Sequence, residues 1–191
     1  MPTRRRPGRP PRGAELPDRD AMLDAAEAAI RHHGHGVSLE TIAAQAGVTK
    51  PVLYDRVGGR ADLAEGLAAR LVERLIGAVT TPALTTPGWA RAIVEPTVQL
   101  LRSHRELFLY VTHSHSPVVA TRLTLATQSA APLAELLVQS ERTDDPTTAQ
   151  LWAHGVVGML NMAVLWSLDA DVTDEHLVSA LCALMETGLG Q

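Results

Sequence analysis

The chain has 191 residues, of which 46% are hydrophobic and 20% are charged, and its formal net charge is −4. This length is enough for one or two domains with a substantial core, and the composition excludes an intrinsically disordered chain. A single cysteine, Cys182, excludes an internal disulfide framework and is typical of a reducing compartment, so we expect a cytoplasmic protein.

Charge is distributed unevenly along the chain. Residues 1–60 contain ten basic and seven acidic side chains, a balance of +3, whereas the remainder contains 7 basic and 14 acidic ones, a balance of −7. Such asymmetry indicates a nucleic-acid partner for the first part, although the net charge is negative. No apolar run reaches the length of about 18 residues that predicts a membrane helix, so no membrane partner is expected.

The first 17 residues are rich in Arg, Pro and Gly, and we expect them to form a flexible arm. Pro7-Gly8-Arg9-Pro10 resembles the Gly-Arg-Pro core of an AT-hook, in which an extended arginine lies in a narrow A·T minor groove. The alternative is a solubilising tail. The arginines predicted to contact DNA from this arm are Arg4, Arg5, Arg6, Arg9 and Arg12.

A first helix is predicted from the cap residue Asp18 to residues 31–33, with its end at Gly34. Its apolar stripe consists of Met22, Ala25, Ala26, Ala29 and Ile30. The histidines near its end (His32, His33 and His35) could suggest a metal site, but positive groups at the negative end of a helix dipole are the simpler explanation. We therefore expect no metal there.

Two short helices joined by a tight turn follow between residues 37 and 57. Ser38 and Thr49 are placed to be N-caps, and Pro51 falls in a first helical turn, where its missing N–H costs nothing. Gly47 can take the positive φ that the turn requires, and Leu53 faces inward. Two helices joined in this way can place one helix in the DNA major groove, although an ordinary helical hairpin is the alternative.

This stretch resembles the DNA-binding domain of the TetR (tetracycline-repressor-like) family of transcription regulators. The matching residues are Val37-Ser38, Ile42-Ala43, Ala46-Gly47-Val48-Thr49, Leu53-Tyr54 and Arg60-Ala61-Asp62-Leu63. Val57 stands where the family usually has Phe, and Arg60 where it usually has Lys. The resemblance implies an all-α fold of about nine helices, with an N-terminal three-helix helix-turn-helix domain and a C-terminal helical ligand-binding and dimerisation domain.

On this basis we expect an arm over residues 1–17, a DNA-binding domain over 18–63 and a regulatory and dimerisation domain over 64–191. A long amphipathic helix should run from Arg60 to about Val79, before a loop at residues 80–88. Further helices are predicted at about 88–103, 105–114, 117–142, 146–168 and 173–188. No convincing strand pattern is present.

The resemblance places the DNA contacts on the second and third helices and the start of the fourth. We expect phosphate or groove-edge contacts from Lys50, Tyr54 and Arg60, and base reading by Thr49, Lys50, Val52 and Asp55. Ser38, the cap of the second helix, completes the predicted DNA-binding set. Lys50 is the only lysine in the chain.

Two further surfaces are predicted in the second domain. The last two helices are apolar nearly all round, so one face should meet the core and the other a second copy of the chain; a central core helix is the alternative. The predicted dimer residues are Leu151, Gly155, Gly158, Leu165, Leu177, Leu181 and Leu184. A small-molecule pocket is predicted among Trp89, Phe108, Tyr110, His113, Trp152, Met159, Asn161, Met162 and Trp166, each of which could equally be core packing.

The sequence thus predicts a homodimeric, sequence-specific transcriptional regulator, and most simply a repressor that an unknown small-molecule effector releases from an inverted-repeat operator in double-stranded DNA. An architectural DNA-binding protein without an effector and a helical metal-dependent enzyme are the alternatives. No nucleophile–base pair, phosphate-binding Gly loop or metal-ligand spacing is evident, so we expect no catalytic residue, no metal ligand and no cofactor.

Overall fold

The computed structural model describes residues 16–79, 84–113 and 124–189, and within these ranges every regular element is a helix. The predicted all-α fold is therefore confirmed. The arm arginines, His115 and the predicted helix start at residue 117 lie outside the described residues. The nine helices of the described ranges are α1 (Arg19–His33), α2 (Leu39–Gln45), α3 (Lys50–Val57), α4 (Arg60–Ala78), α6 (Trp89–Ser103), α7 (Arg105–His113), α8 (Thr124–Gln139), α9 (Pro146–Ser167) and α10 (Asp174–Leu189).

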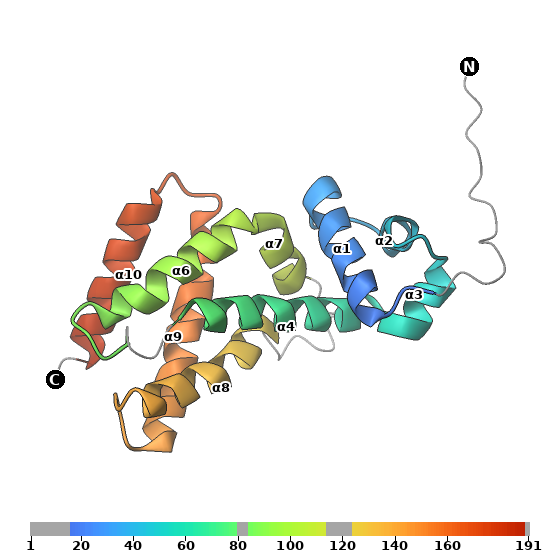
Figure 1. The fold of residues 1–191 in the computed structure, drawn as a ribbon. Coiled ribbons are helices and arrows are strands. Elements are labelled where there is room, and N and C mark those ends of the chain that lie inside the picture. The colour runs from blue at the N-terminus through green and yellow to red at the C-terminus, as the bar shows by residue number, and fades with distance from the viewer. Residues whose placement is uncertain (1–15, 80–83, 114–123, 190–191) are drawn as a thin grey trace.

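Helices α1 to α3 form a small head at one end of the molecule (Figure 1). Asp18 caps α1 by accepting from the backbone N–H of Ala21 at 2.8 Å, and the helix ends at Gly34 with φ 83°. Met22, Ala26, Ala29 and Ile30 are buried as predicted, together with Leu23, whereas Ala25 is only half-buried.

The turn between α2 and α3 follows the predicted chemistry. The Ser38 hydroxyl accepts from the N–H of Thr41 at 3.1 Å, and Gly47 takes a φ of 70°. Thr49 occupies the N-cap position of α3, but its side chain makes no capping bond. Leu53 and Val57 are buried and anchor α3 to the head, which fixes the direction in which its opposite face points.

Helix α4 runs from the head into the larger helical body, as Figure 1 shows. Its inner face is a stripe of buried leucines, and its side toward α1 carries two arginines. Arg70 donates to Asp24 at 2.7 Å, and Arg74 lies 2.8 Å from Glu27. Because these ion pairs join α1 to the middle of α4, they fix the head to the linking helix.

The body is built from α6 to α10 packed around the second half of α4, with α8 along α9 and α10 along α6. Asp145 caps α9 by accepting from the N–H groups of Thr147 and Thr148, and its hydrogen bonds to Thr148 and Thr147 hold the Asp145 pKa below its usual range. Helix α8 ends at Gln139, three residues before the predicted end, because Glu141 takes a left-handed φ of 56°.

Cys182 is buried on α10, and burial raises the pKa of its thiol. None of the described helices combines the length and the apolar character needed to cross a membrane.

Candidate nucleic-acid interface and regulatory cavity

The outer face of α3 is an exposed polar surface of the head. With Leu53 and Val57 buried, the helix turns Lys50, Tyr54 and Asp55 to solvent, and half of the Tyr54 surface is exposed. Thr49 is exposed at the start of the helix. This arrangement offers a cation, a phenol, a hydroxyl and a carboxylate on one short helix, which suits contact with phosphates and base edges.

Val52 is placed differently from these four. It is half-buried and packs against the head core, so only part of its side chain faces outward. Ser38 lies exposed at the start of α2, with its hydroxyl engaged in the cap and 3.0 Å from the Thr41 hydroxyl. The sequence assigned both residues to the same surface as Tyr54; Val52 is only partly exposed, and the hydroxyl of the exposed Ser38 is engaged in its cap.

Lys50 is held by an acidic partner that the sequence analysis did not single out. Its Nζ lies 2.5 Å from Oε1 of Glu40, on the first turn of α2. The hydrogen bond and charge of Glu40 raise the pKa of Lys50, and the same hydrogen bond lowers the pKa of Glu40. The single lysine therefore meets any approaching phosphate in competition with an internal carboxylate.

Arg60 uses its guanidinium for contacts within the chain. It donates to the backbone carbonyls of Val37 at 2.8 Å and of His35 at 2.7 Å, and it lies over the Tyr110 ring at 4.5 Å from the centroid. Two carbonyls and an aromatic face thus engage part of the cation within the chain, and the phosphate contact of Arg60 stays a prediction. Arg60 thus joins the head to α7 of the body.

A second contact reinforces this junction. Oε2 of Glu106 on α7 accepts from the backbone N–H of His35 at 2.8 Å and lies 2.9 Å from Nδ1 of the same residue. These two hydrogen bonds, with the contribution of Arg105, hold the Glu106 pKa below its usual range. The His113 ring lies 6.0 Å from that of His35. His113, predicted to line a pocket, is exposed at this junction instead.

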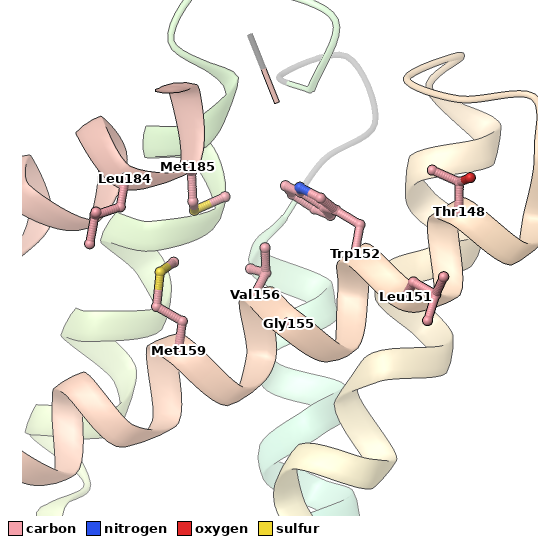
Figure 2. Close-up of a pocket in the computed structure, with 8 residues that line it drawn as sticks. All are labelled: Thr148, Leu151, Trp152, Gly155, Val156, Met159, Leu184 and Met185. Atoms are coloured by element: carbon pink, nitrogen blue, oxygen red, sulfur yellow. The ribbon is translucent and has the colours of Figure 1, made fainter. Parts of the chain in front are cut away.

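An apolar face runs along α9 and α10. Leu151, Met162, Trp166 and Leu184 are the large side chains exposed on it, with 72%, 58%, 64% and 60% of their surfaces accessible. A groove of about 470 Å³ lies on this face. Figure 2 shows the residues that line it, from Thr148 to Met159 along α9 and Leu184 and Met185 on α10. No other atom lies within 4 Å of the Cβ position of Gly155 or Gly158, so both glycines leave this face open.

The structure buries some of the residues predicted for the dimer interface and exposes some of those predicted for the pocket. Leu177 and Leu181 point into the core of their own subunit, at 5% and 3% exposure, and Leu165 is half-buried against it. Met162 and Trp166, predicted for the pocket, lie on the exposed apolar face instead. Helical periodicity predicts which residues share a face of α9 or α10, but it does not predict which of these faces packs against the rest of the body.

The other predicted pocket residues do not converge on one cavity. Phe108 and Tyr110 are fully buried in the core. Trp89 stacks on Trp152 with ring centroids 5.4 Å apart, and Arg142 lies 4.6 Å from the Trp89 centroid. Trp152 and Met159 line the α9–α10 groove. Of the predicted pocket residues, only Asn161 lines the cavity between α4, α6, α8 and α9.

This cavity lies between α4, α6, α8 and α9, is partly open to the surface and has a volume of about 40 Å³. Its walls are formed by Leu75, Ile76, Val79, Ile93, Thr97, Leu101, Ser129, Leu133, Val157, Leu160 and Asn161. The sequence analysis missed ten of these eleven residues because it selected aromatic and sulfur side chains, whereas the walls are aliphatic. The polar positions facing one another from α6, α8 and α9 would have been the better signal.

Within the described ranges, no group of three or more His, Cys, Asp or Glu side chains is arranged to hold a metal ion. His32 and His33 instead contact each other edge to face at the end of α1.

The sequence was compared with protein families and with known proteins. Residues 22–67 match the family described as bacterial regulatory proteins, tetR family. An uncharacterized HTH-type transcriptional regulator of Mycobacterium tuberculosis is 27% identical over 188 residues, covering 89% of this chain and 80% of the relative. The matched segment contains all of α2 and α3 and the described residues predicted to contact DNA.

Solved structures share the architecture. The TetR family repressor AlkX from Dietzia sp. strain DQ12-45-1b superposes with a TM-score of 0.63 at 20% identity, over 93% of this chain and 98% of that one. The TetR-like regulator LfrR from Mycobacterium smegmatis, in complex with proflavine, gives a TM-score of 0.56 at 20% identity, over 89% and 94% of the two chains. At such low identity these similarities establish the fold.

Proposed function

Since this chain is a DNA-binding transcriptional regulator of the TetR family, we propose that it is a homodimeric repressor released from an inverted-repeat operator by a small molecule. The observation that carries the proposal is the exposed outer face of α3, where Lys50, Tyr54 and Asp55 point away from the head core. AlkX, with the same fold, is described as a repressor, which supports this mode of action. The proposal assigns the chain no catalytic activity and places it in the cytoplasm.

The DNA-contact residues proposed from the described part of the chain are Ser38, Thr49, Lys50, Val52, Tyr54 and Asp55. Lys50 and Tyr54 would contact phosphates, while Thr49, Asp55 and the exposed part of Val52 would meet base edges in the major groove. The arm arginines would add minor-groove contacts from residues outside the described ranges. Arg60 stays a predicted phosphate contact, although two carbonyls and Tyr110 engage its guanidinium.

Dimerisation is proposed through the apolar face of α9 and α10. A surface with Leu151, Met162, Trp166 and Leu184 exposed together is costly in water and is typical of a protein interface. A two-fold dimer carries two heads, and heads about 34–36 Å apart read two successive major grooves of an inverted repeat. This gives the dimer a physical reason to prefer symmetric DNA.

Release would act through α4, which both lines the cavity and begins at the head. Leu75 and Ile76 of α4, with its C-cap Val79, form one wall of the cavity. A ligand larger than about 40 Å³ must extend through the open side or move a wall, and a displaced α4 would change the spacing of the two heads. The ligand shifts the equilibrium only by its differential affinity for the two spacings. The proflavine complex of LfrR shows that a relative of this fold accepts a small molecule.

Selection of bound sequences from random double-stranded DNA by the purified full chain tests the proposal. We expect an enriched inverted repeat. Tyr54→Ala should weaken binding to the selected site and to scrambled DNA alike, because it removes a backbone contact, whereas Val52→Ala should mainly reduce the preference for the selected site. An enriched site without symmetry would contradict the dimeric reading, and no enrichment at all would contradict sequence-specific recognition.

A further inference from the structure

We infer that the partly open cavity between α4, α6, α8 and α9 selects a small, neutral, mainly apolar molecule that donates a hydrogen bond, and that it disfavours carboxylates on its walls. The regulatory meaning of this inference rests on the proposed function, but the binding chemistry does not. It follows from which atoms line the cavity and from how their hydrogen-bonding capacity is already used.

The first observation is the absence of charge on the cavity walls that the structure describes. Eight of the eleven lining residues are apolar, and the remaining three are Thr97, Ser129 and Asn161. The neighbouring cation, Arg102, is turned away and bound by Asp174, Ser167 and the carbonyl of Val172. An ionised ligand would lose its hydration without gaining a counter-charge, which opposes entry of either a carboxylate or an ammonium group.

The second observation concerns the donors on the three polar residues. The Thr97 hydroxyl donates to the carbonyl of Ile93 at 2.7 Å, and the Ser129 hydroxyl donates to the carbonyl of Leu125 at 2.7 Å. Each hydroxyl has one hydrogen, so both donors are spent on their own helices. What these residues can still offer a ligand is oxygen lone pairs.

Asn161 follows the same pattern. Its Nδ2 donates to the carbonyl of Val157 at 2.8 Å. Because a carbonyl oxygen can only accept, this bond fixes which side of the amide is nitrogen and leaves Oδ1 as an acceptor. One N–H of Asn161 is the remaining donor among the three side chains. The acceptors are three oxygens: those of the Thr97 and Ser129 hydroxyls and Oδ1 of Asn161. Because acceptors outnumber donors, the cavity favours a ligand that donates a hydrogen bond.

The third observation is size. A volume of about 40 Å³ exceeds the roughly 10–15 Å³ that one water molecule needs, but it is far below the volume of a pocket for a drug-sized ligand. An alcohol or phenol matches this chemistry, and one larger than the cavity must extend through its open side or displace an aliphatic wall. A long acyl chain would have to do the same and would also bury its carboxylate.

The test uses the full chain without DNA and measures binding by calorimetry and by the melting temperature at neutral pH. The probes are hexan-1-ol, its isomer methyl pentyl ether, hexanoate and hexylammonium. We expect hexan-1-ol to bind about threefold to tenfold more tightly than the ether, the difference that one net hydrogen bond makes. Neither ion should bind measurably. Tighter binding of hexanoate, equal binding of the two isomers, or binding of none of the probes would overturn the inference.

Variants localise the effect. Thr97→Val and Ser129→Ala remove acceptor oxygens with little change of shape, so the preference for the alcohol over the ether should fall toward one in the double variant. Leu133→Phe should fill the cavity and weaken hexan-1-ol, whereas Leu136→Phe, on the same helix but not on the cavity wall, should not. The melting temperature of each variant without probe shows that it is folded. Unchanged alcohol preference in a folded double variant would refute the assigned acceptors.

These results are independent of the proposed repressor function, because no DNA is present in the assay. If hexan-1-ol binds as expected but never releases DNA, the cavity chemistry stands and the release mechanism fails. If hexanoate binds best and also releases DNA, ligand-controlled repression stands and the selectivity inferred here fails.

Discussion

Neutralising Glu40 should strengthen DNA binding, because Glu40 holds the only lysine of the chain and adds negative charge beside the proposed DNA surface. In the structure, Lys50 Nζ lies 2.5 Å from the Glu40 carboxylate, and both side chains are partly exposed. A phosphate that contacts Lys50 from outside would lie roughly 6 Å from that carboxylate. Glu40→Gln keeps the size of the side chain and removes its charge.

The magnitude follows from Coulomb's law. Two unit charges about 6 Å apart in water repel by about 0.7 kcal/mol, which corresponds to roughly a threefold change in affinity for one head. The proposed dimer binds with two heads, so the expected gain is about tenfold at low salt. Since a more available Lys50 releases more counterions, the salt dependence should also steepen, by up to about 0.9 in log–log slope for each new phosphate contact.

Fluorescence anisotropy with operator and scrambled DNA, measured at several salt concentrations, provides the assay. The gain should be similar on both sequences, because phosphate contacts carry no sequence information. Glu135→Gln, an exposed carboxylate on α8, is the matched control for net charge. In a Lys50→Met background the gain from Glu40→Gln should shrink. Equal affinity of Glu40→Gln and the unchanged chain, with equal salt slopes, would refute this role for the Lys50–Glu40 pair.

Three further predictions concern stability, pH and assembly. Gly47→Ala should lower the free energy of unfolding, measured by urea titration, by about 1–2 kcal/mol, because Gly47 has a φ of 70° that an alanine adopts only with strain. Lack of space is not the cause, since the new Cβ would meet no neighbouring group within 4 Å. Gly36→Ala, with the same open space and no positive φ, is the control. The Glu106 pKa is lowered by its hydrogen bonds to His35, so the carboxylate stabilises the fold fully above the ordinary value of 4.5, and this contribution is lost as pH falls through the lower folded pKa. Glu106→Gln should therefore melt earlier than the unchanged chain at neutral pH, and this difference should become smaller as the pH falls through the folded pKa of Glu106; a difference that does not change with pH would contradict the assignment. Trp166→Asp should shift the chain from dimer to monomer in sedimentation at micromolar concentration, whereas the exposed but more polar Gln150→Asp should not; a dimer that persists in both would move the interface elsewhere.

Local sequence chemistry predicted the head closely. Ser38 and Asp18 cap their helices, Gly47 takes the left-handed conformation, and Leu53 and Val57 face inward, because each of these properties depends on residues within a few positions. The bounds of α6, α7, α9 and α10 lie within one residue of the predicted ranges for the same reason. Caps, prolines and helical periodicity carry their information locally.

Contacts between residues distant in sequence could not be predicted from local sequence patterns. Arg60 and Tyr110 are 50 positions apart, and His35 and Glu106 are 71 apart, so nothing local showed that the predicted phosphate contact would close a junction between head and body. Lys50 and Glu40 are on separate helices, and only the angle between those helices brings them together. The charge of each residue was evident, but its partner was not.

By itself, the sequence determined the helical fold class, the turn chemistry of the head and the family resemblance, since these arise from short-range preferences and a local motif. Tertiary structure decided which apolar faces are covered and which are left for a partner. It exposed Met162 and Trp166 beside Leu151 and Leu184, buried Leu177 and Leu181, and lined the cavity with aliphatic residues around three acceptor oxygens. The physical reason is that burial depends on how four or five helices pack together, and periodicity within one helix leaves that packing undetermined.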